Sequence, residues 1–498
     1  MQSIATGRLA VGLRTVEEHP QFIPLKVNGT LPPYLSSSSL FRIGPGRFEA
    51  THSDGRPLKV RHWFDGLSIL HHFQIDARQN QVSYRSRSLS DALLRAIEAT
   101  PSSSFVQFTF GRSDPCRSAL GKLFQLWTPS TVDPQHLTEA ANINVTVQHI
   151  PGKGVCARTD SVSSLKIDEN TLEIDHFFDL NNVAGTKGAH IAASHGHYDA
   201  HTGDFINYTF KFGPGNVHYT VFRIDRDGKS HQLASFRDKP MYLHSFATTE
   251  KYVILMLWPL EINSLAVLYN KSLMDGMKFH KDHPTKFVVI SRERNEIHAT
   301  YTYDAFFCFH TVNAFDVDNS VVIDLSYYRD ATIIDEFEVD KMLNASCFSL
   351  SSLVRFTLDG IHEAAAAKSS PRARMHVINP EPFELMRINP DRQRLDYRYT
   401  YGVTNVNALF DAIAKVCVKT GERWLWKAEN RIVGEPIFVP DPQGQSEEDG
   451  CLLVVVLDVE GKHSSMCVID AKSMHMIADA AVPDVVPLGF HGMYKNIQ

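Results

Sequence analysis

Short apolar stretches dominate the hydrophobic pattern of this chain. They are rich in Val, Ile, Phe and Tyr, and they are either continuously apolar or alternate with polar residues. Turn signals interrupt them roughly every eight to twelve residues, among them Asp54-Gly55, Asp65-Gly66 and Asp227-Gly228. Because short strands joined by closely spaced turns build sandwiches, barrels and propellers, the pattern predicts an all-β fold.

One local pattern recurs: an apolar stretch that ends in Ile-Asp, then a polar turn, then another apolar stretch. It occurs at Ile75-Asp76, Ile167-Asp168, Ile224-Asp225 and Ile469-Asp470, with Ile378-Asn379 as a variant. The spacings are roughly one to three multiples of fifty-odd residues, as expected for propeller blades with inserted loops. The repeat favours a propeller, although a pair of sandwiches would use the same strand pattern.

Helical patterns are few. Residues 90–98 begin with Ser-Asp, which can cap a helix, and carry apolar residues at helical spacing, so we expect a helix there. Residues 117–127 have the same spacing and are unusually apolar. Residues 363–374 and 441–450 are typical of solvent loops, and we interpret them as insertions within the fold.

Composition narrows the classes of function. Large all-β folds keep a length of 498 residues in one unit, so we expect a single domain over residues 1–498. The net charge of -6 argues against a nucleic-acid partner. Seven scattered cysteines make neither a disulfide framework nor a zinc ribbon, which is typical of a reducing compartment. Without a signal-like or membrane-spanning apolar stretch, we expect a cytoplasmic protein with at most peripheral membrane contact.

Four histidines each border an apolar stretch: His195, His244, His310 and His491. Widely spaced histidines in similar settings suggest one metal held by four strands, and a ligand set without thiolate or carboxylate favours oxygen chemistry over a structural zinc site. The chain has 24 histidines, so each one alone is more often a surface or core residue. Spacing cannot choose between His195 and its neighbours in the His-Gly-His-Tyr-Asp-Ala-His segment, His197 and His201.

Five ordered segments carry a resemblance to a known family. They are Phe-Arg-Ile-Gly-Pro-Gly-Arg-Phe (41–48), His-Trp-Phe-Asp-Gly-Leu-Ser-Ile-Leu-His-His-Phe (62–73), Tyr-Arg-Ser-Arg (84–87), Gly-Glu-Pro-Ile-Phe-Val-Pro (434–440) and Gly-Phe-His-Gly (489–492). Together they resemble the signature segments of the carotenoid cleavage oxygenases, from about residue 20 to the C-terminus. The resemblance implies a seven-bladed β-propeller, with helices and loops capping its top face and Fe(II) on its axis.

The resemblance also implies the residues of the site. The four iron ligands would be His195, which takes the first position of its His-x-His pair, His244, His310 and His491. Metal-bound histidines donate their other ring N–H to an acceptor, and the family uses three glutamates for this. The matching positions are Glu384, Glu435 and Asp160. Asp160 departs from the family's glutamate, and a side chain one methylene shorter could still reach its histidine through a small backbone shift or a water.

The implied reaction is cleavage of a conjugated C=C bond by O2 into two carbonyl products, with a carotenoid or apocarotenoid as the polyene substrate. The stilbene-cleaving branch of the family carries a lysine just before the acid that Asp160 matches, where this chain has Thr159, so we favour the carotenoid branch. A retinoid isomerase on the same scaffold stays open. A non-catalytic propeller is the alternative from another class, and it would hold no stoichiometric iron.

An apolar substrate requires an apolar, aromatic tunnel and access to a membrane. Candidates for the tunnel stand beside the histidines in sequence: Tyr242, Trp258, Phe306, Phe307, Phe309 and Phe490. Each could equally be core packing. The apolar segment with Leu120, Leu123, Phe124, Leu126 and Trp127 beside Lys122 fits a peripheral membrane contact, or a helix packed on the top face of the propeller.

Overall fold

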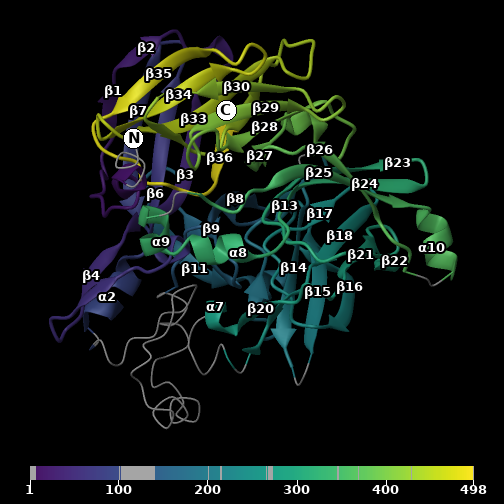
Figure 1. The fold of residues 1–498 in the computed structure, drawn as a ribbon. Helices are drawn as coiled ribbons and strands as arrows, with labels where there is room; N and C mark the ends of the chain where they lie inside the picture. The colour runs from purple at the N-terminus through teal and green to yellow at the C-terminus, as the bar shows by residue number, and fades with distance from the viewer. Residues whose placement is uncertain are drawn as a thin grey trace.

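Seven antiparallel sheets follow one another around a common axis and form the blades of a β-propeller (Figure 1). The structure is a computed structural model that describes residues 7–99, 101, 141–199, 201–213, 216–264, 266, 273–344, 347–367, 370–427 and 429–496. The all-β, seven-bladed architecture predicted from the sequence is confirmed.

The first three blades come from the two ends of the chain and its first half. From the innermost strand outward, blade 1 consists of β36 (Gly492–Asn496), β3 (Ser38–Arg47), β6 (Leu67–Asp76), β7 (Gln81–Ser88) and β1 (Ile23–Leu25). Blade 2 consists of β8 (Thr146–Ile150), β9 (Gly154–Arg158), β10 (Ser163–Ile167) and β11 (Ile174–Asp179). Blade 3 consists of β12 (Ile191–Ala192) with β13 (His197–Tyr198), then β14 (Phe205–Phe212), β15 (Val217–Ile224) and β16 (Ser230–Asp238).

The remaining four blades follow in chain order. Blade 4 consists of β17 (Ala247–Thr248), β18 (Tyr252–Leu257), β21 (Thr285–Ser291) and β22 (Glu296–Tyr303). Blade 5 consists of β23 (Thr311–Val317), β24 (Ser320–Tyr327), β25 (Ser352–Asp359) and β26 (Arg374–Asn379). Blade 6 consists of β27 (Glu384–Arg387), β28 (Tyr399–Thr404), β29 (Ala412–Cys417) and β30 (Arg423–Lys427). Blade 7 consists of β31 (Arg431–Val433) with β32 (Ile437–Pro440), then β33 (Gly450–Asp458), β34 (His463–Asp470), β35 (Met476–Val482) and β2 (Val27–Gly29).

The two ends of the chain close the ring. Strand β36 supplies the innermost strand of blade 1 by pairing with β3, with Phe41 opposite Met493. Strand β2 pairs with β35 at the outer edge of blade 7, with Val27 opposite Ala480. Innermost strands of neighbouring blades contact one another, for example β23 with β27 and β32 with β36, so their ends meet around the axis.

The Ile-Asp repeat marks the same hairpin in four blades. Asp76, Asp168, Asp225 and Asp470 each lie where the third strand of a blade turns into the fourth. Each carboxylate accepts a hydrogen bond from a backbone N–H within the turn, as turn aspartates commonly do. The interpretation as a blade repeat is therefore correct for these four copies. Asn379, the variant, instead ends the outer strand of blade 5.

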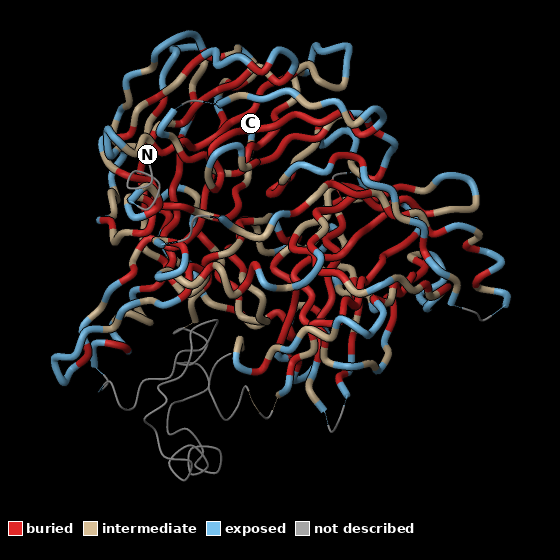
Figure 2. The backbone as a smooth tube through the Cα atoms, in the orientation of Figure 1, coloured by how far each residue is buried: buried red, intermediate tan, exposed pale blue. Residues whose placement is uncertain are grey.

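Burial explains the mixture of continuous and alternating stretches. Strand β33 lies inside its sheet and between neighbouring blades, and its run of Leu and Val is buried on both faces. Strand β16 lies at an outer edge and alternates more between buried and exposed residues. Figure 2 shows the result, with buried backbone through the blades and exposed backbone at the hairpin tips and outer loops.

Helices and two small sheets lie outside the blades. The sheets pair β4 (Glu49–Thr51) with β5 (Pro57–Lys59), and β19 (Leu260–Ile262) with β20 (Met277–Phe279). The helices are η1 (Leu9–Val11), η2 (Pro33–Leu35), η3 (Trp63–Asp65), α2 (Asp91–Ala99), α5 (Leu180–Ala184), α7 (Leu273–Gly276), α8 (Thr332–Glu336), α9 (Val339–Asn344), α10 (Ile361–Ala367) and η4 (Pro390–Arg392). The segment around η3 hydrogen-bonds to α8 and to the start of α9, through Trp63 N to Phe337 O and Val339 N to Arg61 O.

The expected helix at residues 90–98 is confirmed as α2. The expected solvent loop at 363–374 is wrong in part, because α10 occupies residues through Ala367; its alanine run has a strong helix propensity. The predicted helix at 117–127 and the membrane contact through Leu120, Leu123, Phe124 and Trp127 lie outside the described residues. Within the described parts of the chain, no helix is long and apolar enough to cross a membrane.

Candidate metal centre

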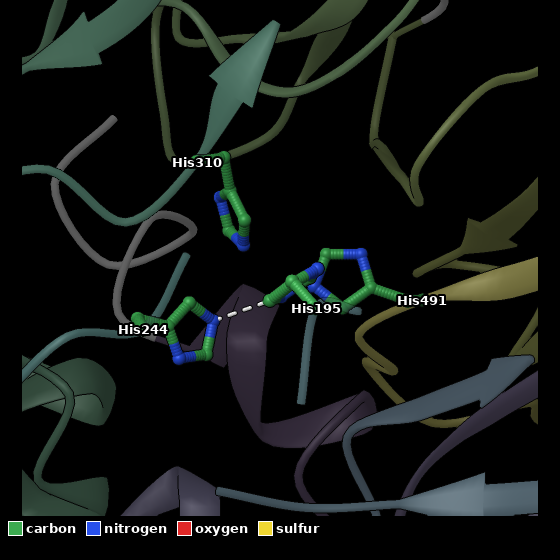
Figure 3. Close-up of side chains that lie close together, drawn as sticks. All are labelled: His195, His244, His310 and His491. Carbon is green, nitrogen blue, oxygen red and sulfur yellow. Dashed lines mark hydrogen bonds between the residues drawn. The ribbon is translucent and has the colours of Figure 1, made fainter. Parts of the chain in front are cut away.

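Four imidazole rings converge at the axis of the propeller. His195, His244, His310 and His491 each present a ring nitrogen, and these four nitrogens lie within 4.8 Å of one another. Ring centroids are 4.3 Å apart for His195 and His491, and 5.2 Å apart for His244 and His310 (Figure 3). All four candidate ligands named from the sequence are therefore brought to one point.

Each blade contributes one residue to this centre or to its support. His195 follows β12, and His244, His310 and His491 stand just before the innermost strands of blades 4, 5 and 1. Glu384 begins β27, and Glu435 stands two residues before β32. Asp160 stands two residues after β9, beside the start of β8. Six of these residues lie at or just before the start of an innermost strand, since His195 also precedes β13, and Asp160 lies beside the start of β8. The closed ring itself therefore assembles the site.

A carboxylate orients each of three rings. The Nδ1–H of His244 donates to Asp160 over 2.8 Å, that of His310 donates to Glu384 over 2.6 Å, and that of His491 donates to Glu435 over 2.8 Å. A proton held on Nδ1 leaves the lone pair on Nε2, which points to the centre. His195 has no carboxylate partner among the described residues.

The free nitrogens suit a metal ion. His195 Nε2 and His244 Nε2 are 3.0 Å apart, and two imidazoles at right angles on a metal at about 2.1 Å would have the same separation. His310 Nε2 is buried and has no hydrogen-bond partner among the described groups. A buried acceptor without a donor is costly unless something binds it, and a cation at the centre would satisfy all four nitrogens together.

Asp160 reaches its histidine directly, although it is shorter than the glutamate expected there. Its Oδ2 accepts from His244 and from the hydroxyl of Tyr242, which is 2.7 Å away. Its Oδ1 accepts from the backbone N–H of Ser194 over 2.9 Å. The carboxylate thus links the ring of one candidate ligand to the backbone beside another, and the bridging water considered from the sequence is unnecessary.

Glu435 is fixed by two arginines. Arg42 Nη1 donates to Oε2 over 2.8 Å, and Arg387 Nε donates to Oε1 over 2.8 Å. The backbone N–H of Gly492 donates to Oε2 as well. Among the described residues, Glu384 has no arginine partner; it accepts from the Ser326 hydroxyl over 2.6 Å and from the Leu385 N–H. Sequence reasoning missed both arginines, although Arg42 belongs to a segment that carries the family resemblance.

The electrostatics favour neutral rings at His195 and His491 and charged carboxylates at Asp160, Glu384 and Glu435. Burial, followed by the other three rings, holds the pKa of His195 well below its ordinary value. Burial also lowers the pKa of His491 to about 4. For Glu435 burial acts to raise the pKa, but Arg387, His491 and Arg42 outweigh it and hold the pKa well below its usual range. Neutral imidazole is the form that binds metal.

An aromatic wall stands next to the centre; it consists of Trp63, Phe64, Phe309, Phe337 and Phe490. The rings of Trp63 and Phe490 are 4.7 Å apart, and those of Phe64 and Phe309 are 6.0 Å apart. Phe309 lies 5.5 Å from His244. Trp63 and Phe64 come from η3 and Phe337 follows α8, so segments outside the blades supply three of the five rings. Phe309 and Phe490 each directly precede a histidine of the centre.

The predicted tunnel residues have three different kinds of surroundings. Phe309 and Phe490 belong to the aromatic wall, and Phe307 packs 4.7 Å from Phe309. Phe306 packs on Phe287 and Phe356 between blades 4 and 5, with Trp258 beside it. Tyr242 binds Asp160. Trp63, Phe64 and Phe337 were missed, because they are remote in sequence from every histidine of the centre.

The alternative histidines have other surroundings. His197 Nε2 lies 2.8 Å from the carbonyl oxygen of Phe246, and its Nδ1 lies 3.2 Å from the hydroxyl of Thr248. His201 is exposed in a turn, where its backbone N–H donates to Asp199. Neither side chain belongs to the converging group, so the first position of the His-x-His pair is the one that faces the axis.

Comparisons with known proteins agree with this architecture. The model of the family described as retinal pigment epithelial membrane protein matches residues 13–496, and the chain belongs to this family. It is 29% identical to β,β-carotene 15,15'-dioxygenase of Gallus gallus, with 97% of each chain covered. It is 26% identical to torulene dioxygenase of Fusarium fujikuroi, with 96% of this chain and 92% of that one covered. The resemblance to carotenoid oxygenases is confirmed.

Solved structures share the fold. A Synechocystis apocarotenoid oxygenase with a single glutamate-to-aspartate substitution superposes with a TM-score of 0.82, at 22% identity and with 100% of both chains covered. The cobalt-substituted form of the Synechocystis enzyme superposes with a TM-score of 0.81, at 21% identity and with 99% of both chains covered. At these identities the likeness establishes the propeller alone.

Proposed function

We propose that this protein is an iron(II) dioxygenase that cleaves a conjugated C=C bond of a carotenoid or apocarotenoid. The observation that carries the proposal is the convergence of His195, His244, His310 and His491, with three of the rings oriented by buried carboxylates. The relatives named as carotene and torulene dioxygenases support the same class of reaction.

The four histidines would hold the iron through neutral nitrogen. Asp160, Glu384 and Glu435 would act through His244, His310 and His491, because each fixes the ring's tautomer and orientation. An Fe(II) ion held by these four nitrogens would supply the O2-activating chemistry at the centre. Adding two oxygen atoms to one C=C bond yields two C=O groups, so the reaction balances without a reductant.

The rest of the chain would bind and orient the substrate and exclude water from it. The aromatic wall offers flat apolar surfaces to a polyene, and it reaches the centre through Phe309. The depth to which the polyene enters would decide which double bond lies at the iron. Thr159, beside Asp160, offers no cation to a phenol, which argues for a polyene substrate over a hydroxylated stilbene.

One experiment tests the proposal and its alternatives together. Protein purified without oxygen is analysed for iron, then supplied with O2 and with β-carotene, torulene, an apocarotenal, a hydroxystilbene or a retinyl ester, and the products are identified by mass. We expect about one iron per chain and two carbonyl fragments from a polyene. Stilbene aldehydes or an isomerised retinoid would replace the proposed activity with another of the family, and the absence of stoichiometric iron would indicate a scaffold.

A further inference from the structure

Arg158, the last residue of β9, is a buried cation without a polar partner. Its exposed fraction is 0%. Neither its Nε nor its two terminal nitrogens has a hydrogen-bond or ion-pair partner among the described residues. A guanidinium carries five N–H donors in a rigid plane, and arginine is rarely buried without a carboxylate or carbonyl groups to receive them. Arg85 is the ordinary case, because it donates to the carbonyl oxygens of Glu169 and Asn170.

Two hydroxyl groups flank this guanidinium. Thr146 on β8 and Ser164 on β10 are both directly opposite Arg158 in the strand register, so the three side chains lie on the same face of blade 2. Both residues are buried, and both hydroxyls also lack a hydrogen-bond partner among the described groups. The guanidinium of Arg158, with its five N–H donors, therefore has one O–H donor on each side. The three side chains form a row across three strands.

No described carboxylate forms a hydrogen bond or an ion pair with the guanidinium. Burial raises the pKa of the Cys156 thiol to about 12, so the nearest cysteine is neutral. Asp160 attracts Arg158 electrostatically, but its oxygens are occupied by His244, Tyr242 and the Ser194 N–H. Burial lowers the pKa of Arg158 to about 10, which leaves the guanidinium charged at neutral pH.

The row is enclosed between two blades. The guanidinium carbon of Arg158 lies 5.7 Å from the ring of Phe205 on β14 of blade 3. Phe205 belongs to the apolar cluster that seals blades 2 and 3 together with Phe178, Ala192 and Phe222. An occupant must therefore be small, and a single negative charge matches the single positive charge of the row.

We propose that Arg158, Thr146 and Ser164 form an internal binding site for one small monovalent anion of the halide class. The anion would receive N–H donors from the guanidinium and O–H donors from both hydroxyls, which suits a spherical acceptor that imposes no direction of its own. A phosphate or sulfate would bring excess charge and acceptor oxygens that these three side chains cannot satisfy. The site includes none of the four converging histidines, and the proposal does not depend on the proposed reaction.

Bromide provides the direct test in the full-length, metal-loaded protein. Crystals grown in bromide are measured at the bromine absorption edge. We expect an anomalous peak in contact with the Arg158 guanidinium and the two hydroxyls, and no such peak in crystals of Arg158→Met. Ordered water alone at this position, in wild-type crystals at high bromide concentration, would overturn the proposal.

Thermal stability gives a second readout in solution. The melting temperature is titrated with chloride or bromide against gluconate at constant ionic strength, and the midpoint gives the apparent Kd. We expect a saturable halide stabilisation that Arg158→Met abolishes and that the Thr146→Val, Ser164→Ala double variant weakens about tenfold or more. Arg85→Met is the matched control, because its guanidinium is satisfied by carbonyls, and it should keep the halide response. An equal halide response in Arg158→Met would contradict the assignment.

Discussion

Asp160 Oδ2 lies 2.8 Å from His244 Nδ1, a direct hydrogen bond made by an acid one methylene shorter than glutamate. The same oxygen accepts from Tyr242, two residues before the histidine in sequence. Three donors therefore hold the carboxylate: the ring of His244, the hydroxyl of Tyr242 and the backbone of Ser194. The local structure is matched to aspartate.

Lengthening this acid should be harmful. In Asp160→Glu the added methylene would push the carboxylate into Tyr242 or displace the His244 ring, so we expect kcat/KM to fall about 10- to 100-fold. Steady-state kinetics of the iron-loaded variant measure this loss. Adding Tyr242→Phe removes the hydroxyl that occupies the space, and the double variant should recover part of the activity. Wild-type activity in Asp160→Glu alone would show that the pocket is not matched to aspartate.

Removal of one candidate ligand should empty the centre. His244→Ala or His310→Ala leaves three imidazoles in a site built for four, and we expect iron to fall from about one per chain to a small fraction of that after gel filtration. Elemental analysis and oxygen consumption should decline together. His201→Ala is the control, since His201 is exposed and outside the converging group. Full iron content in either ligand variant would refute the assignment.

The two arginines on Glu435 should differ in their effect on folding. The Arg42 side chain is 6% exposed, and Arg42→Met removes a buried cation from Glu435, so we expect the free energy of unfolding to fall by about 3 kcal/mol. The Arg387 side chain is 40% exposed, and Arg387→Met should cost about 1 kcal/mol or less. Urea unfolding of both variants measures the difference. Equal losses would show that burial does not decide the contribution of each pair.

His71 should make folding depend on pH. Burial, followed by Arg42 and His19, lowers its pKa in the folded protein to about 3, whereas a histidine in the unfolded chain titrates near 6.5. As the pH falls below 6.5, only the unfolded chain takes up the proton, so the stability associated with neutral His71 is present at neutral pH and is lost on acidification.

The size of this effect follows from the same linkage. Between pH 7 and pH 5, wild-type protein should lose about 2 kcal/mol more unfolding free energy than His71→Gln, which cannot titrate. Urea unfolding at the two pH values gives the comparison, and the contributions of other groups cancel between the two proteins. His201→Gln, an exposed substitution, serves as the control. Parallel losses in wild type and His71→Gln would be inconsistent with a neutral buried ring.

Substitution of Phe309 should change substrate specificity, whereas substitution of Phe306 should change only stability. Phe309 lies beside His244, and we expect Phe309→Ala to raise KM and to change the ratio of cleavage products from a long polyene. Phe306 is fully buried between Phe287 and Phe356, and Phe306→Ala should cost about 3–5 kcal/mol of stability without changing that ratio. Product analysis at a temperature where both variants stay folded tests the contrast. Identical product ratios for Phe309→Ala and wild type would remove Phe309 from the substrate path.

The strands and the propeller repeat could be predicted from the sequence because short local patterns encode both. Asp76, Asp168, Asp225 and Asp470 bind the backbone of their own turns, so the signal is contained within a few residues. The expectation of a solvent loop at 363–374 was partly wrong for a local reason too, because the helix propensity of the alanine run outweighs the polarity of the residues around it.

The candidate metal ligands could not be chosen among the histidines from local sequence patterns alone. His195 and His197 are two residues apart in similar surroundings, and the resemblance to the family separated them before the geometry did. The partners Arg42 and Tyr242 were not predicted, because each meets its carboxylate across a blade interface that no spacing encodes. The row of Arg158 with Thr146 and Ser164 appears only when the strand register is known.

The pairing of β3 with β36 also sets a time at which the centre can form. During synthesis, a chain that has emerged through blade 6 holds His195, His244 and His310, while His491 and Glu435 have yet to be made. The fourth nitrogen arrives only when β36 is inserted beside a strand that the ribosome produced some 450 residues earlier. Iron would thus bind when the ring closes. A chain that stalls before that step would be released with β3 unpaired on its inner edge and without metal.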